Sequence, residues 1–322
     1  MTSAIDAASI DQAARCLVAG GLVAFPTETV YGLGADAASA EAVAKVYAVK
    51  GRPADHPLIV HVLDEAQGRR WARFDARAER LVRRFWPGPL TLVLPRAEGA
   101  PPFACGGQSS IGLRCPSHPV ARALMRRFTE LGGLGIAAPS ANRFGKVSPT
   151  RAAHVVADLG ADTPMVLDGG AAEVGVESTI LDLTRAVPVL LRPGRVGRDR
   201  LAEVLGEPVA DRDAAAPRAS GTLAAHYRPD TRVELVEATA LDARARAIGP
   251  ARVAAWGPER PTAPVAHWEP APADPWVFET VLYDTLRRLD GLGAQVLLVA
   301  APPSGAAWDA VRDRLARAGA AG

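Results

Sequence analysis

The densest group of potentially reactive side chains lies in residues 26–34, PTETVYGLG, between a short apolar segment and a predicted helix. Two hydroxyls, one carboxylate and two glycines allow a turn to contact polar ligand groups closely. Open α/β sheets place ligand sites at connections of this kind. The spacing Gly32-x-Gly34-x-x-Ala37, with Asp55 downstream, also matches part of a dinucleotide fingerprint. An ordinary tight turn would fit the same residues.

A basic turn follows at residues 50–53, KGRP. Only three of the 37 basic residues are lysines, so Lys50 stands out. Two cations on a turn fixed by glycine and proline suit an anionic ligand, although basic residues that end a helix also complement its dipole. His61, in the apolar segment 58–62, is either a core histidine or a residue that faces the same site.

Hydroxyl and cationic side chains recur where later predicted strands begin or end, at residues 109–114, 140–142, 148–150, 177–179 and 192. A site assembled from several strand ends is the usual design of α/β enzymes. The sequence contains no Walker A, G-x-S-x-G, H-E-x-x-H or EF-hand motif. Hydroxyls and cations without a dedicated nucleophile indicate phosphate or nucleotide chemistry, in which positioning and charge neutralisation dominate.

Alternating strand and helix patterns predict the elements that position these residues. Strands are predicted at 22–25, 58–62, 91–94, 111–114, 134–138, 165–167, 179–183, 187–191, 232–236, 251–255 and 295–300. Helices are predicted at 9–19, 39–50, 118–131, 150–159, 199–205, 239–248, 276–290 and 305–318, with a Pro-rich loop at 257–275. We therefore expect a mixed-sheet α/β domain over 1–206, a linker over 207–231 and a smaller α/β domain over 232–322.

Composition narrows the class of protein further. The 322 residues are 48% apolar and 22% charged, with a net charge of +2, so the chain is a folded protein rather than a polycation. Cys16, Cys105 and Cys115 form no C-x-x-C pair, which argues against a zinc site and favours a reducing compartment. No apolar run approaches the ~20 residues that span a bilayer, and the start at Met1 lacks signal-peptide features. We expect a cytoplasmic protein without membrane contact.

Six segments in order carry a family resemblance: PTETVYGLG, KGRPxxxPLIVHV, WPGPLTLVL, APSANxxGxxSPT, DGG…GVESTI and LLRPG. Together they resemble the YrdC-like domain of L-threonylcarbamoyladenylate synthases over about residues 8–206. The remaining residues resemble the longer, two-domain form of that family. The resemblance implies a twisted mixed-sheet YrdC-like domain, a linker that closes over the active site and a smaller Rossmann-like α/β domain.

The resemblance also implies an adenylyl transfer, in which L-threonine, bicarbonate and ATP give threonylcarbamoyl-AMP and pyrophosphate. The product would pass to the machinery that makes N6-threonylcarbamoyladenosine in tRNA. Mg²⁺ would arrive with the ATP, and no metal held by the protein is expected.

The family's site residues carry over by position. The implied threonine site comprises Thr29, His61, Arg114, the backbone of Ala138, and Ser178. The implied ATP site comprises Arg52, His56, Ser110, Ser140, Asn142, Ser148, Arg192 and Tyr227. Lys50 and Arg52 are the expected catalytic cations, which would neutralise carboxylate or phosphate charge. His56 departs from the family pattern, since many relatives have asparagine there.

Two other functions fit parts of the sequence. YrdC-like domains have a basic concave face, so an RNA-binding module, or a weak tRNA contact beside the enzyme activity, is the first alternative. The carbamoyltransferase of hydrogenase maturation carries a similar domain and is the second. That protein adds zinc-binding cysteine pairs, which this sequence lacks.

Overall fold

The computed structural model describes residues 5–249 and 252–320. The chain forms two compact units, of which the first comprises 1–144 and 148–222 and the second 145–147 and 223–322. Apart from the short segment 145–147, the chain passes from the first unit to the second between Thr222 and Leu223, inside the segment predicted as a linker. Met1 and the first position of the strand predicted at 251–255 lie outside the described residues.

The first unit is built on a mixed sheet, which has ten strands within the described residues, in the order β10-β9-β8-β4-β5-β3-β6-β2-β1-β7. The sheet combines parallel pairs such as β3–β5 with antiparallel pairs such as β4–β5. The predicted mixed sheet is thus confirmed. The strands are β1 (Val23–Phe25), β2 (Gly32–Asp36), β3 (Ile59–His61), β4 (Leu90–Pro95), β5 (Ser110–Arg114), β6 (Ile136–Ala137), β7 (Met165–Val166), β8 (Thr179–Asp182), β9 (Val189–Arg192) and β10 (Ala210–Asp211).

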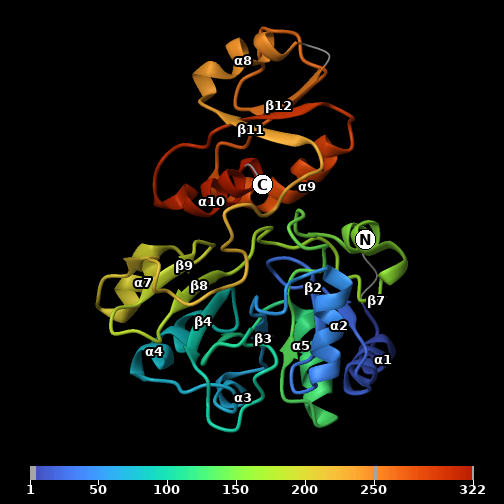
Figure 1. Ribbon diagram of the computed structural model, residues 1–322, viewed down its shortest axis with the longest axis vertical. Helices are drawn as coiled ribbons and strands as arrows, with labels where there is room; N and C mark the ends of the chain where they lie inside the picture. Colours follow the sequence, from blue (N-terminus) through green and yellow to red (C-terminus); the bar gives the residue numbers. More distant parts are fainter. Residues whose placement is uncertain (1–4, 250–251, 321–322) are drawn as a thin grey trace. The chain divides into compact units, whose positions relative to one another are not determined.

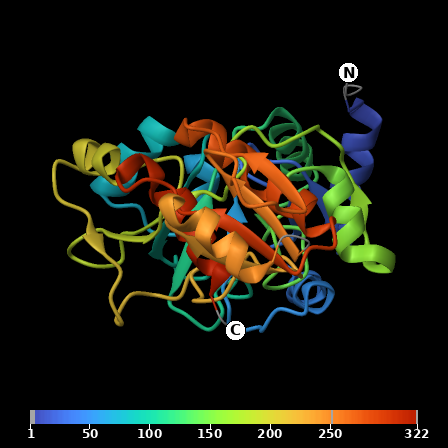
Figure 2. The ribbon, with the colours of Figure 1, turned by 90° about the horizontal axis from the view of Figure 1, so that it is seen from above.

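Helices cover both faces of this sheet. The first unit contains α1 (Ala7–Val18), α2 (Ala40–Lys50), α3 (Glu65–Gly68), α4 (Ala76–Phe85), α5 (Pro119–Glu130), α6 (Ala152–Leu159), the short 3₁₀ turn η1 (Gly160–Asp162) and α7 (Arg198–Leu205). Apolar faces of α1 and α5 pack together against β1, whereas α2, α4 and α7 contribute to a separate, larger core. Figures 1 and 2 both place α1 and α7 at opposite ends of the sheet.

The alternation of side chains along β4 separates the large core from the face that carries polar groups. Leu90, Leu92 and Leu94 belong to the core shared with α4 and α7. Thr91 and Val93 point to the opposite face, where Val93 packs with residues of β8 and β9. Arg114, His61 and Ser178, described below, share this second face with Thr91.

The first unit contains elements that the sequence analysis did not predict, among them the short helix α3 and the strand β10, which lies in the segment predicted as a linker. Residues 32–36, predicted as the end of a polar turn, form β2, which pairs antiparallel with β1. This excludes the dinucleotide interpretation, because that fingerprint needs its glycines in a turn that opens a helix. Residues 76–85 form α4, an unpredicted helix whose N-cap is Asp75. The helix was not predicted because its apolar face is short, comprising Ala78, Leu81 and Val82, and lies among several arginines.

The second unit is a separate four-stranded parallel sheet in the order β11-β14-β12-β13. Its strands are β11 (Arg232–Val236), β12 (Val253–Gly257), β13 (His267–Pro270) and β14 (Val296–Ala300), and its helices are α8 (Leu241–Ile248), α9 (Pro275–Asp290) and α10 (Asp309–Gly319), with 3₁₀ turns η2 (Ala238–Ala240) and η4 (Ala306–Trp308). Figure 1 shows α8 on one side of this sheet and α9 and α10 on the other. The second α/β fold is as predicted, but β13 lies within the segment predicted as a Pro-rich loop.

Candidate functional site

Arg192 is the centre of a buried polar network at the end of β9. Its Nε donates to the carbonyl of Ser178 at 3.0 Å, and its Nη2 donates to the Ser178 hydroxyl at 3.2 Å. That hydroxyl also lies 2.7 Å from the hydroxyl of Thr91 on β4. Arg192, predicted to bind ATP, and Ser178, predicted to bind threonine, are thus in direct contact, and Thr91 on β4 also contacts Ser178.

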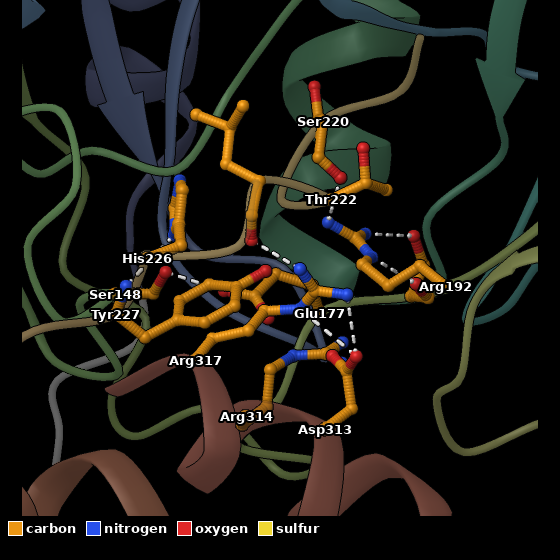
Figure 3. A network of polar contacts seen from close by, with 12 residues as sticks. Ser148, Glu177, Arg192, Ser220, Thr222, His226, Tyr227, Asp313, Arg314 and Arg317 are labelled. Atoms are coloured by element: carbon orange, nitrogen blue, oxygen red, sulfur yellow. Dashed lines mark hydrogen bonds and ion pairs between the residues drawn. The ribbon is translucent and has the colours of Figure 1, made fainter. Parts of the chain in front are cut away.

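The segment that follows β10 connects Arg192 to Arg52. Arg192 Nη1 donates to the carbonyl of Ser220 at 3.0 Å, beside which it is drawn in Figure 3. Arg52 Nη2 donates to the hydroxyl of the same serine at 3.2 Å and to the carbonyl of Pro57 at 2.9 Å. Ser220 therefore holds the two guanidinium groups near each other, and the sequence did not single it out for this role.

Arg114 and His61 occupy paired positions on neighbouring parallel strands, so their side chains share one face of the sheet. Arg114 is 4% exposed, and its Nη2 lies 2.8 Å from Oε1 of Glu28. The other oxygen of Glu28 accepts the backbone N–H of Ser117 at 3.1 Å. A buried ion pair of this kind fixes the guanidinium in one position. Arg114 Nε has no hydrogen-bond partner among the described residues.

His61 is buried and is held edge-on by the ring of Phe25, with the ring centroids 6.2 Å apart. Burial, followed by the nearby charge of Arg114, lowers the pKa of His61 to about 3. The imidazole is therefore neutral at physiological pH. Its Nδ1 atom is buried and has no hydrogen-bond partner within the described part of the chain. Such an atom is costly to leave unsatisfied, which is typical of a position that a ligand completes.

Lys50 lies at the end of α2 and is buried, and its Nζ donates to the backbone carbonyls of Ser140 at 2.6 Å and of Asn142. Burial and the neighbouring guanidinium of Arg52 lower the pKa of the ammonium group. The same loop is joined to residues 31–34 by backbone hydrogen bonds, including Leu33 N–H to the carbonyl of Pro139 at 2.8 Å. Lys50 thus ties the basic turn to the 139–142 loop.

Three further predicted residues form hydrogen bonds within the first unit. Ser148 is buried and donates to Glu177 at 2.5 Å, directly beside Ser178. Thr29 is buried, with its hydroxyl 2.9 Å from that of Thr27. The N–H of Ala138 donates to the carbonyl of Ile59 at 3.0 Å.

Two further predicted residues lie close to the basic turn or at a strand end. His56 contacts Phe144 edge-on, and burial, followed by the charge of Arg52, lowers the pKa of its imidazole. Ser110 begins β5 and lines a hollow that Ser220 also lines.

Tyr227 belongs to the second unit, and its predicted nucleotide contact stays a prediction. Its φ of 61° is unusual for a residue other than glycine. Its N–H donates to Nδ1 of His226 at 3.0 Å, and its ring stacks on Tyr283 with the centroids 5.6 Å apart. The guanidinium of Arg314 lies 5.3 Å from the ring centroid (Figure 3). These contacts fix the tyrosine within its own unit.

The described residues contain no group of His, Cys, Asp or Glu side chains arranged to hold a metal ion. Over the same residues, no helix combines the length and the apolar character needed to cross a membrane.

The arrangement as a whole offers fixed cations and hydroxyls but no activated nucleophile. Arg52, Arg114 and Arg192 are each less than a tenth exposed, so the low local dielectric strengthens their attraction for anions. Such a site can bring two anionic reactants together and stabilise the charge that develops between them.

Comparison with known proteins shows which family the chain resembles. The family model Sua5_yciO_yrdC, described as "Telomere recombination", matches residues 15–194, and the model "Threonylcarbamoyl-AMP synthase, C-terminal domain" matches residues 196–320. The chain is 46% identical to the threonylcarbamoyl-AMP synthase of Pyrococcus abyssi over 68% of its length, and 43% identical to that of Bacillus subtilis over 71%. The matched regions span 65% and 66% of those two relatives.

The fold of the chain is also similar to solved structures, in one case over nearly its whole length. The crystal structure of P. abyssi Sua5 complexed with L-threonine matches 98% of this chain and 96% of its own, with a TM-score of 0.89 and 36% identity. A crystal structure of E. coli YciO, at 23% identity and a TM-score of 0.51, shares the fold over 59% of this chain. The chain therefore belongs to the Sua5/YciO/YrdC family and carries the C-terminal domain of its threonylcarbamoyl-AMP synthases.

Proposed function

We propose that the protein is a threonylcarbamoyl-AMP synthase, which forms threonylcarbamoyl-AMP and pyrophosphate from L-threonine, bicarbonate and ATP. The observation that carries the proposal is the contact between Arg192 and Ser178, because it joins the residue expected to bind ATP to one expected to bind threonine. The names of the relatives and the threonine bound in the P. abyssi structure support the same activity.

The chemistry needs little besides positioning and charge. Bicarbonate and the threonine amine condense to a carbamate with loss of one water molecule. A carbamate oxygen then attacks the α-phosphorus of ATP while the bond to the bridging oxygen of pyrophosphate breaks. Both reactants are anions, so the barrier falls when fixed cations neutralise the charge. We assign Arg114, His61 and Ser178, with Thr29 and the Ala138 backbone, to threonine. We assign Arg52, His56, Ser110, Ser140, Asn142, Ser148, Arg192 and Tyr227 to ATP.

The contacts of Lys50 suggest that it acts by positioning as well as by charge. Its ammonium group holds two carbonyls of the loop that carries Ser140 and Asn142. Mg²⁺ would accompany the triphosphate. The product would pass to the enzymes that modify tRNA, and we expect the proposed activity in the cytoplasm.

The test is pyrophosphate release measured with each of the three substrates omitted in turn, and with L-serine in place of L-threonine. We expect release only when ATP, bicarbonate and L-threonine are all present. The variant Arg52→Gln should reduce it at least 100-fold, consistent with loss of one charge-stabilising donor. Arg70→Gln changes an exposed arginine and should leave it unchanged. Release that does not require threonine would contradict the proposal.

A further inference from the structure

A second basic hollow lies in the first unit, at the end of β4 and the beginning of β5. It has a volume of about 640 Å³, and its lining includes Arg73, Arg96, Arg185, Ser109 and Ser110. The described residues that line it include no acidic side chain. We call this hollow the arginine groove. None of the residues predicted for either substrate lies in it except Ser110.

Three chain segments build the arginine groove by backbone pairing. Arg96 N–H donates to the carbonyl of Ser109 at 2.9 Å, and Pro95 pairs with Ser110 in the β4–β5 register. Arg73 N–H donates to the carbonyl of Pro95 at 2.9 Å. Two arginines and two serines are therefore set side by side by the sheet itself rather than by flexible loops.

The cations in the groove differ in how they are neutralised. Arg185 is paired through both terminal nitrogens with the carboxylate of Asp213, at 2.8 Å each, so it adds no net charge. Arg96 donates through Nη1 to the carbonyl of Ala100, whereas its Nε is buried and has no hydrogen-bond partner among the described residues. Arg73 is exposed and forms no side-chain ion pair within the same residues. Arg73 and Arg96 thus line the groove as two positive charges that form no ion pair among the described residues.

The arginine groove adjoins the substrate site through Ser110. This serine also lines the smaller hollow that is lined by Thr91 and Ser220. Those two residues contact Ser178 and Arg52, respectively. Ser110 therefore lines both the smaller hollow and the arginine groove.

We infer that the arginine groove binds the phosphate oxygens of inorganic pyrophosphate. Guanidinium groups match phosphate geometry through paired N–H donors, and Arg73 and Arg96 contribute two such groups to the lining of the groove. The identity of the ligand rests on the proposed function, whose second product is pyrophosphate. After adenylyl transfer, pyrophosphate would bind in the groove and would thus be separated from the newly formed acyl phosphate.

The experiment is a calorimetric titration of inorganic pyrophosphate into the full-length protein, with no other substrate present. We expect Arg73→Glu to raise the pyrophosphate Kd at least tenfold. Arg70→Glu, the same change of charge on an exposed arginine three residues away and outside the groove, should alter it less than twofold. Ser109→Ala should raise the Kd by a smaller factor, and it keeps the test valid if Arg73→Glu does not fold.

Equal Kd values for Arg73→Glu and Arg70→Glu would overturn the inference, as would a wild-type protein that binds no pyrophosphate at millimolar concentration. A loss confined to the affinity for a short RNA, with pyrophosphate binding unchanged, would also overturn it. Because the titration requires no turnover, its outcome is independent of whether the protein makes threonylcarbamoyl-AMP.

Discussion

Glu28 determines where the Arg114 guanidinium sits, although it does not belong to the set of residues predicted to bind substrate. The two side chains are 5% exposed or less and form a 2.8 Å ion pair. The carboxylate is fixed in turn by the backbone N–H of Ser117. A cation held in this way can receive a substrate carboxylate without first losing side-chain entropy.

Replacing Glu28 by glutamine should therefore weaken threonine binding and stability together. The variant removes one charge of a buried pair and leaves Arg114 uncompensated, a change that costs about 3–5 kcal/mol of unfolding free energy. We expect the KM for L-threonine to rise at least tenfold, with a smaller effect on the KM for ATP. Glu41→Gln, at an exposed position on α2, is the matched control. Steady-state kinetics and chemical denaturation give the two readouts, and an unchanged threonine KM would contradict the assignment.

The low pKa of His61 predicts a specific pH dependence of stability. The folded protein holds the imidazole neutral down to about pH 3, whereas the unfolded chain protonates it near 6.5. The unfolded state therefore binds more protons below pH 6.5, and stability falls as the pH falls. This residue alone should lower the unfolding free energy by about 2 kcal/mol between pH 7 and pH 5.

Denaturation of wild type and His61→Gln at a series of pH values checks this prediction. The variant should lose less stability than the wild type over that interval. Parallel curves for the two proteins would show that the imidazole titrates normally in the folded state.

The chemistry of the individual residues could be predicted better than their contacts. Arg52, Arg114 and Arg192 are cations at turns or strand ends, which sequence alone can locate. Thr91 and Ser220, in contrast, join the site through hydrogen bonds to residues 87 and 168 positions away, respectively. Nothing in their local sequence distinguishes them from ordinary strand and loop residues, so only the folded sheet shows that they connect the cations.

At the scale of elements, β2 was missed because its sequence, Gly-Leu-Gly-Ala-Asp, has low strand propensity. Packing explains why a strand forms there. A methyl group on Gly34 would lie 2.7 Å from the ring of Phe25 and 2.9 Å from the side chain of Ile136. The glycine is thus required by close packing on neighbouring strands, and a periodic sequence pattern cannot reveal this.

Gly34→Ala should therefore destabilise the first unit by roughly 1–3 kcal/mol, the usual cost of overpacking a core. Gly112→Ala, also within a strand of the first unit, is the control, since a methyl group there would lie 3.5 Å from its nearest atom and the residue has no positive φ. Thermal unfolding of both variants measures the effect. Equal melting temperatures would show that the strand can shift to accommodate the methyl group.

Lys50 links two elements, the end of α2 and the 139–142 loop, and its replacement tests whether the link is needed. Lys50→Met keeps the length of the side chain but removes the donor to the carbonyls of Ser140 and Asn142. We expect kcat to fall at least 100-fold and amide exchange in residues 139–146 to accelerate. Lys45→Met, where the exposed lysine donates to the carbonyl of Gly20 at 2.7 Å, is the control. A large loss of kcat with unchanged exchange would assign Lys50 a purely electrostatic role.

The two-part organisation of the whole molecule follows from the sequence, because the regular strand–helix pattern stops near residue 206 and resumes near 232. What the sequence could not show is that residues 216–220 remain part of the first unit. Ala216 and Ala219 pack against the sheet core of β8 and β9, and Ser220 contacts both Arg52 and Arg192. The Pro- and Ala-rich composition of this region is typical of a linker. It therefore gave no indication that residues 216–220 complete the polar site.

The central claim is that one sheet edge brings a carboxylated threonine against the α-phosphate of ATP. Mass spectrometry of the products from ATP, L-threonine and ¹³C-labelled bicarbonate tests it most directly. We predict an adenylate whose mass includes threonine and the labelled carbon, formed in equal amount with pyrophosphate. An adenylate of threonine without the labelled carbon, or pyrophosphate released without any threonine adduct, would contradict the claim.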